Sequence, residues 1–167
     1  RNHYLQLTEP VHWQGPNAEI LLANLAGHIA EREREELVKR LGIPEEKVKL
    51  NFLAQEFGPG NVILIRYFNS QRVEIFTGYG ERGKRAERVA QEVAREAKNF
   101  SKSYAQLDPY LSDQILLYLA LSAGEFTTNF LSSHFHTNLQ VIEKFIKIDK
   151  QIQNLKPNLY LVKIRGK

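Results

Sequence analysis

The stretch from Tyr110 to Ile146 reads YLSDQILLYLALSAGEFTTNFLSSHFHTNLQVIEKFI. Its pattern predicts a helix from Pro109 to about Leu121, a short strand over 126–131, a polar loop over 132–138 and a second helix over 138–146. A glycine turn joins the first helix to the strand. Helices that alternate with a short strand are typical of a chain that packs sheet and helix layers together.

Two histidines lie in the polar run just before the second predicted helix. A helix start offers free N–H groups and a partial positive charge to an anion, and a neutral imidazole can act as nucleophile or base near pH 7. Three interpretations of His134 and His136 remain open from spacing alone. They are a metal site, which needs at least one more protein ligand, a structural pair hydrogen-bonded in a loop, and a nucleophile beside a phosphate. If the segment is extended, both side chains point the same way.

The composition is typical of a soluble globular protein. Of 167 residues, 43% are hydrophobic and 25% are charged, which suits one ordinary domain or two small ones. The chain has no cysteine, which excludes disulfides and thiolate metal sites and fits a cytoplasmic protein. No apolar run approaches the length of a membrane helix. The net charge of +4 is compatible with a nucleic-acid partner. Because the chain lacks methionine and opens on Arg1, we expect a piece of a longer protein.

Outside the opening stretch, hydrophobic periodicity predicts two more helices and six strands. The helices are expected at 28–41 and 84–100, and the strands at 4–13, 20–25, 47–53, 62–68, 72–77 and 159–164. Gly42 suits the C-terminal cap of the first helix. Residues 101–108 are predicted to be a linker, with Asp108 as the cap of the helix that begins at Pro109. That helix is apolar nearly all round from Ile115, so we expect it to be buried.

Two motifs near residue 80 have ordinary structural interpretations beside functional ones. Residues 78–83, GYGERG, fit the dinucleotide-binding pattern G-x-G-x-x-G between a strand and a helix. No second parallel strand with an acidic residue follows the helix, so a glycine-rich turn is preferred. A basic cluster at the helix start could contact RNA phosphates, but glutamates interleave with it, which favours a solvated helix face. The cluster comprises Arg82, Lys84, Arg85 and Arg88.

Several separated blocks resemble RNA 3'-terminal phosphate cyclases, and they occur in the order of that family over nearly the whole chain. The C-terminal blocks are YLSDQILL at 110–117, ALSAG at 120–124, Phe126-Thr127, SSH at 132–134 and Thr137-Asn138. The upstream blocks are LQLTE at 5–9, HIAERE at 28–33, GPGN at 58–61 and GERGKRAE at 80–87.

The resemblance implies an α+β fold in two parts. Residues 5–103 would be a small inserted α/β sandwich-like domain. Residues 104–167 would be the C-terminal part of the large catalytic domain, which is built from repeated β–α–β–α–β–β units. The N-terminal half of the same protein would then be absent from this chain and would be its partner.

The resemblance also implies an ATP-dependent enzyme that converts an RNA 3'-phosphate end to a 2',3'-cyclic phosphate through a covalent histidine-AMP intermediate. His134 would be the nucleophile. Tyr110, Asp113 and Gln114 would bind the nucleotide, and Asp113 would also bind Mg²⁺ (or Mn²⁺). The family's alternative is a non-catalytic, cyclase-like RNA-binding protein that acts in ribosome assembly and lacks the histidine, so His134 favours the enzyme.

Overall fold

The computed structural model describes residues 4–54 and 58–167, and it divides the chain into two compact units. One unit comprises the described residues of 13–98, and the other combines residues 4–12 with residues 99–167. Each unit has its own four-stranded mixed sheet with helices, which confirms the predicted α+β fold class. No helix in the described ranges is long and apolar enough to cross a membrane.

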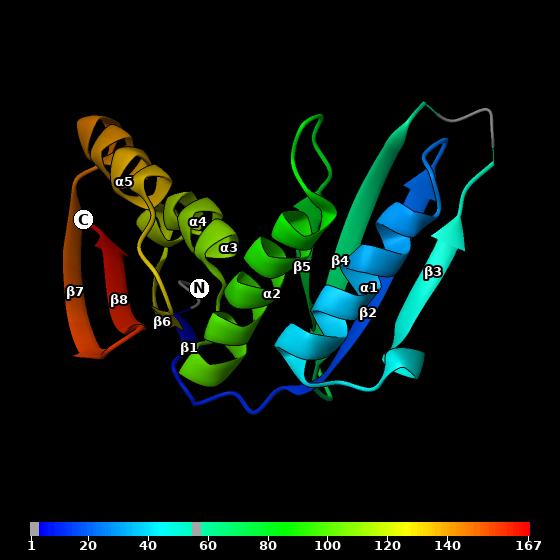
Figure 1. The fold of residues 1–167 in the computed structure, drawn as a ribbon. Helices are drawn as coiled ribbons and strands as arrows, with labels where there is room; N and C mark the ends of the chain where they lie inside the picture. The colour runs from blue at the N-terminus through cyan, green and yellow to red at the C-terminus, as the bar shows by residue number, and fades with distance from the viewer. Residues whose placement is uncertain (1–3, 55–57) are drawn as a thin grey trace. The chain divides into compact units, whose positions relative to one another are not determined.

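The unit of residues 13–98 is a sheet with the strand order β3-β2-β4-β5, covered on one face by two helices (Figure 1). Its strands are β2 (Gln14–Ala23), β3 (Val48–Phe52), β4 (Gly60–Phe68) and β5 (Val73–Tyr79), and its helices are α1 (His28–Leu41), η1 (Glu45–Lys47) and the first part of α2 (Ala86–Ser103). β2 is parallel to β3 and antiparallel to β4, which is antiparallel to β5.

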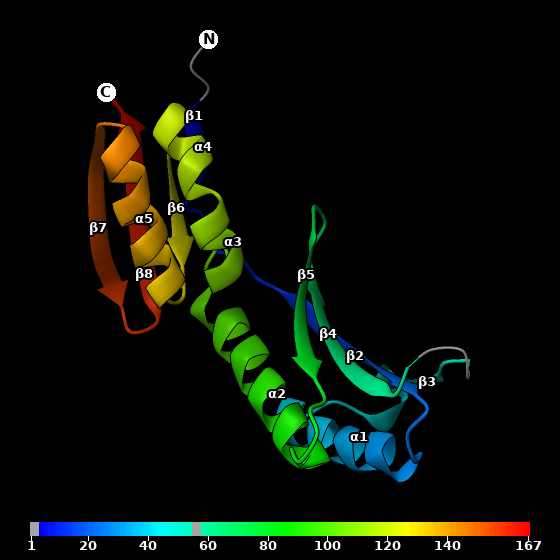
Figure 2. The ribbon, with the colours of Figure 1, turned by 90° about the horizontal axis from the view of Figure 1, so that it is seen from above.

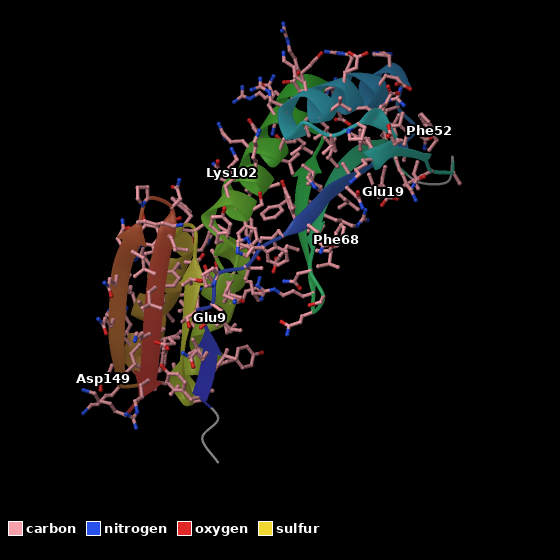
Figure 3. The ribbon with its side chains drawn as sticks, turned by 90° about the horizontal axis from the view of Figure 1, so that it is seen from below. Glu9, Glu19, Phe52, Phe68, Lys102 and Asp149 are labelled. Atoms are coloured by element: carbon pink, nitrogen blue, oxygen red, sulfur yellow. The ribbon has the colours of Figure 1, made fainter. Side chains whose placement is uncertain are left out.

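Alternating side chains of β2 and β4 point into the core between this sheet and its helices. Ile20, Ile63 and Ile65 are fully buried, and the helices contribute mainly alanines, valines and Leu37. α2 lies close to the sheet, and its small alanines permit this approach. At the closest point Gly78 of β5 faces Val93 of α2, where an added Cβ would lie only 3.0 Å from a methyl group of Val93. The opposite face is mixed, since the ion pair of Glu19 with Arg66 lies there beside exposed apolar side chains such as Ile75 (Figure 3 labels Glu19).

The predicted helix over 28–41 is confirmed at its predicted bounds. Gly42 adopts the left-handed conformation and its N–H donates to the carbonyl of Val38, as expected of a C-terminal cap. The strand predicted at 20–25 begins six residues earlier in the structure, since β2 begins at Gln14. Its first residues include Gly15 and Pro16, which are usually turn residues, and here they lie in an irregularity of the β2–β4 register.

The second unit has the strand order β1-β6-β8-β7, with helices packed on one face of the sheet (Figure 2). Its strands are β1 (Tyr4–Leu7), β6 (Ala123–Thr128), β7 (Ile148–Lys156) and β8 (Leu159–Gly166), and its helices are the end of α2, then α3 (Pro109–Gln114), α4 (Leu116–Leu121) and α5 (Ser133–Phe145). β6 is parallel to β1 and antiparallel to β8. Phe126, Phe135 and Leu116 are central members of its core.

Several boundaries in this unit differ from the prediction. The strand predicted over 4–13 pairs only over Tyr4–Leu7, because Pro10 has no N–H for a ladder and the N–H of Val11 donates instead to Tyr104. The strand predicted over 126–131 lies at Ala123–Thr128. β7 was not predicted, since all of its side chains after Ile148 are exposed and no apolar alternation marks it.

The prediction of a wholly buried helix after Ile115 was wrong. α3 and α4 meet at Ile115, and α4 buries only the side that packs on β6 and β8, with Leu116, Leu119 and Ala120. Tyr118 and Leu121 are 72% and 70% exposed. A helix that packs on one face of a sheet, with no further layer outside it, buries only one side. Apolar residues on its other side are therefore not covered by the described part of this chain.

Candidate active site

α5 begins within the run that was predicted to be a loop. Ser132 caps it, as its hydroxyl oxygen accepts a hydrogen bond of 3.0 Å from the N–H of Phe135. Phe135 is fully buried and anchors the first turn in the core, while His134 is exposed. His134 is therefore the second residue of a 13-residue helix, where free N–H groups and the helix dipole favour an anion.

His134 and His136 do not share a face, contrary to the expectation for an extended segment. Two residues along a helix are about 200° apart around its axis. The ring of His136 stands edge-on to Phe135, with centroids 5.5 Å apart and planes at 86°. Because the two imidazoles diverge, a metal bound by both of them is disfavoured, and the role of each histidine has to be considered separately.

α3 carries the other predicted site residues. Asp108 caps it, as predicted, by accepting hydrogen bonds from the N–H groups of Tyr110 at 2.7 Å and Leu111 at 3.1 Å. Tyr110 is exposed, with 62% of its surface accessible, and Gln114 is exposed as well. Asp113 is partly buried one turn after Tyr110, so these two side chains can lie on one face of α3.

α3 and α5 pack against each other within the second unit. The helix that carries Tyr110, Asp113 and Gln114 is therefore in contact with the helix whose first turn carries His134. The remaining histidines lie elsewhere: His12 stands edge-on to Tyr104, His28 starts α1 in the other unit, and His3 lies outside the described residues.

The carboxylates available for a metal ion are few. Within residues 4–54 and 58–167, no three His, Asp or Glu side chains are grouped as a metal site. Asp108 uses its carboxylate to cap α3, which leaves Asp113 as the nearest uncommitted acid on that helix. A single carboxylate does not make a cage for Mg²⁺, but it fits an ion that arrives on nucleotide phosphates and keeps several waters.

Asn129 is a residue at this end of β6 that the sequence analysis did not select. Its side chain is buried, and its carboxamide oxygen has no hydrogen-bond partner among the described residues. It directly follows Thr128, whose hydroxyl donates to the carbonyl of Phe130. The available signal was a polar side chain at the end of a strand whose residues are all buried, just before the α5 cap.

The fold and this arrangement define an α+β chain of two sheet-and-helix units, one of which carries an exposed histidine at a helix start. Comparison with known proteins is more specific. Residues 19–102 match the family described as RNA 3'-terminal phosphate cyclase (RTC), insert domain. The chain belongs to the RNA 3'-terminal phosphate cyclase family, as its sequence blocks predicted.

Relatives match over most of this chain. An RNA 3'-terminal phosphate cyclase of Ectopseudomonas mendocina is 39% identical over 147 residues, which cover 87% of this chain and 42% of that protein. One of Pseudomonas aeruginosa (strain UCBPP-PA14) is 42% identical over 145 residues, which cover 86% of this chain and 42% of that protein. One of Ralstonia nicotianae is 38% identical over 150 residues, which cover 89% of this chain and 43% of that protein. The chain thus spans about two fifths of the length of these relatives.

The family match also bears on the two predicted domains. The matched residues 19–102 lie inside the predicted inserted domain, 5–103. The compact units are divided at slightly different places, since residues 4–12 belong with the C-terminal unit. The assignment of residues 104–167 to a larger catalytic domain stays a prediction.

Proposed function

We propose that the protein to which this chain contributes is an RNA 3'-terminal phosphate cyclase, which uses ATP to convert an RNA 3'-phosphate to a 2',3'-cyclic phosphate. The observation that carries the proposal is His134, exposed at the capped start of α5 and beside α3, in a member of this family. The N-terminal half of the same protein would complete the site, and the enzyme would act in the cytoplasm.

The proposed reaction has three steps. A ring nitrogen of His134 attacks the α-phosphorus of ATP, the bond to the β-phosphate oxygen breaks and pyrophosphate leaves. An oxygen of the RNA 3'-phosphate then attacks the histidine-bound phosphorus, the bond from phosphorus to the ring nitrogen breaks, and AMP passes to the RNA while the imidazole is released. Finally the neighbouring 2'-hydroxyl loses its proton and attacks the activated 3'-phosphate, which closes the ring and expels AMP. Only a ribonucleotide carries this hydroxyl, so the substrate would be RNA.

The position of His134 suits the first step. His134 belongs to the first turn of α5, and the free N–H groups of this turn would stabilise charge that develops on the phosphate oxygens. Ser132 fixes the direction of this turn, and buried Phe135 holds it against the core. A covalent intermediate divides one difficult substitution into easier steps.

The residues of α3 would bind the nucleotide. The exposed ring of Tyr110 can stack on the adenine, and the carboxylate of Asp113 would hold Mg²⁺ (or Mn²⁺) carried by the phosphates. The metal ion, when bound, would neutralise phosphate charge. Gln114 would donate or accept a hydrogen bond beside the nucleotide, since its exposed amide can do both.

The test is covalent labelling of the protein joined to its N-terminal half. We expect label from α-phosphate-labelled ATP to remain on the denatured protein, with the acid-labile and base-stable behaviour of a phosphoramidate. His134→Ala should abolish it, and His136→Ala, on the other side of the same helix, should leave it nearly unchanged. Undiminished labelling of His134→Ala would sink the assignment. A folded protein that binds RNA without label would favour the non-catalytic role in ribosome assembly.

A further inference from the structure

A cavity of about 560 Å³ lies within the unit of residues 13–98, far along the chain from His134. The first turns of α1 form one wall, the start of β4 forms the floor, and the segment from Gly80 into α2 forms the other wall. In Figure 1 the β5–α2 connection and the beginning of α1 both lie at the upper end of this unit. The volume is in the range of small-molecule sites.

The cavity and its rim carry several cationic groups, of which some form ion pairs and others do not. Lys84 and Arg88 share Glu92, and Arg32 forms a two-bond ion pair with Glu87. Arg82 and Arg85, by contrast, form no ion pair with the described part of the chain, and both line the cavity next to the first turn of α2. The acid Glu81 precedes them in the same segment. Two guanidinium groups beside a helix start have the charge and the hydrogen-bond donors that bind a phosphate.

A second, independent feature of the cavity is the carboxyl group of Glu33. Glu33 lines the cavity, and the residue is fully buried. One of its oxygens accepts a hydrogen bond from the side-chain amide of Asn61, and the other has no partner among the described residues. A buried acceptor without a donor costs stability, so a ligand in the cavity that brings an N–H or O–H group to this oxygen would remove that cost.

The position of Glu33 is held by its surroundings. The N–H of Gly80 donates to the backbone carbonyl of Asn61 at 3.0 Å, and a Cβ at Gly80 would lie 1.6 Å from the Asn61 side chain. The glycine therefore lets the β5–α2 segment close over Asn61. Burial raises the pKa of Glu33 to about 7, so near neutral pH this carboxyl can both accept and donate a hydrogen bond.

We propose that this cavity binds one nucleotide unit of single-stranded RNA, with its phosphate on Arg82 and Arg85 and a ribose hydroxyl or base amino group on Glu33. A nucleotide combines an anion with neutral donors a few ångströms away, which is the combination that the two walls present. The choice of RNA as the source rests on the proposed function, whereas a free nucleotide would carry the same chemistry. The glycine-containing run 78–83 thereby acquires a role without a dinucleotide-binding fold.

The experiment measures binding of a fluorescein-labelled ten-nucleotide oligoribonucleotide to the 167-residue chain by anisotropy. Arg82→Gln with Arg85→Gln removes two charges from the cavity, and Arg95→Gln with Lys39→Gln removes two exposed charges of the same unit outside it. We expect the first pair to weaken binding about tenfold or more and to reduce the salt dependence, and the second to weaken it about twofold at most. Equal losses, or no binding by the unaltered chain, would overturn the proposal.

Competition identifies what the cavity takes. AMP should displace the RNA at lower concentration than inorganic phosphate does, and Glu33→Gln should reduce this advantage of AMP severalfold. Phosphate that competes as well as AMP, with no effect of Glu33→Gln, would overturn the assignment of Glu33. AMP that binds to the cavity while RNA does not would overturn RNA as the source.

The labelling of His134 in the longer protein is a separate measurement. The Arg82 and Arg85 variants should leave the histidine-AMP label unchanged, because ATP is small and reacts at the other unit. If the unaltered longer protein binds RNA in the cavity but takes no label from ATP, the proposed cyclase reaction is wrong and the cavity proposal still stands. Loss of the label in the cavity variants would contradict the independence of the two sites.

Discussion

Asn61 donates a hydrogen bond from its side-chain amide to Glu33, and this contact joins the start of β4 to the buried side of α1. A neutral amide is a weak replacement for the water that an ionised carboxylate loses on burial. The hydrogen bond to Asn61 lowers the pKa of Glu33, but the larger effect of burial raises it to about 7 from an ordinary 4.5.

The stability of the chain should therefore fall as pH rises from about 4.5 to about 7. In this window folded Glu33 retains a proton that the unfolded chain has released, so the folded state binds more protons and loses relative stability with rising pH. The whole shift corresponds to about 3 kcal/mol, an upper limit for one group. Urea unfolding at pH 5 and pH 8 measures the difference.

Glu33→Gln is the matched variant for this prediction. Glutamine keeps an acceptor for Asn61 and cannot ionise, so its free energy of unfolding should lose this part of the pH dependence. At pH 8 the variant should equal or exceed the unaltered chain in stability. Parallel pH profiles for the two proteins would show that Glu33 does not carry the effect.

Gly80→Ala should destabilise the chain by about 1–3 kcal/mol, as is usual when an atom is forced into packed surroundings. The added Cβ would meet the carboxamide of Asn61, which Glu33 holds in place. Gly60→Ala is the control, since an added Cβ there meets nothing within 4 Å. Thermal unfolding compares the two variants, and similar midpoints would contradict the crowding at Gly80.

Ser132→Ala should cost about 0.5–2 kcal/mol, the usual loss for a missing N-terminal cap. The change removes the hydrogen bond to the N–H of Phe135 and loosens the turn that carries His134. Ser133→Ala is the neighbouring control, because that side chain is exposed and follows the cap. The unfolding free energies of the two variants should differ, and an equal cost would assign the effect to α5 in general.

Elements with strong periodicity and explicit end signals were predictable from the sequence. The bounds of α1 and the cap Gly42 follow from its charged and apolar faces. Asp108 and Pro109 likewise mark the start of α3. In each case the signal is local, because the cap and the helix it ends are within a few residues of each other.

The start of α5 was missed because its first turn is polar. Ser132 is a good cap, but only Phe135 among the next few residues is buried, so apolar spacing begins late. β7 was missed for a related reason, as its side chains are mostly solvated and its partner β8 is needed to define it. These elements depend on contacts between segments that local pattern does not contain.

The two candidate sites differ in the same way. His134, Tyr110, Asp113 and Gln114 were selected through family resemblance, and the structure adds that their two helices pack together. The importance of Glu33 needed the structure, since α1 contains many glutamates and only burial distinguishes this one. A sequence pattern does not show which of several similar acids lacks a hydrogen-bond partner.

Tyr110→Ala should weaken the use of ATP without removing the nucleophile. Loss of a stacked base costs about 1–3 kcal/mol by alanine substitution, so the ATP concentration for half-maximal labelling of His134 should rise roughly 5- to 150-fold in the longer protein. Saturating ATP should restore most of the label, because the imidazole is unaltered. Tyr118→Ala is the matched control, an exposed tyrosine on α4 of the same unit. If both variants label like the unaltered protein at every ATP concentration, Tyr110 does not bind the base, and adenine recognition would have to come from other residues.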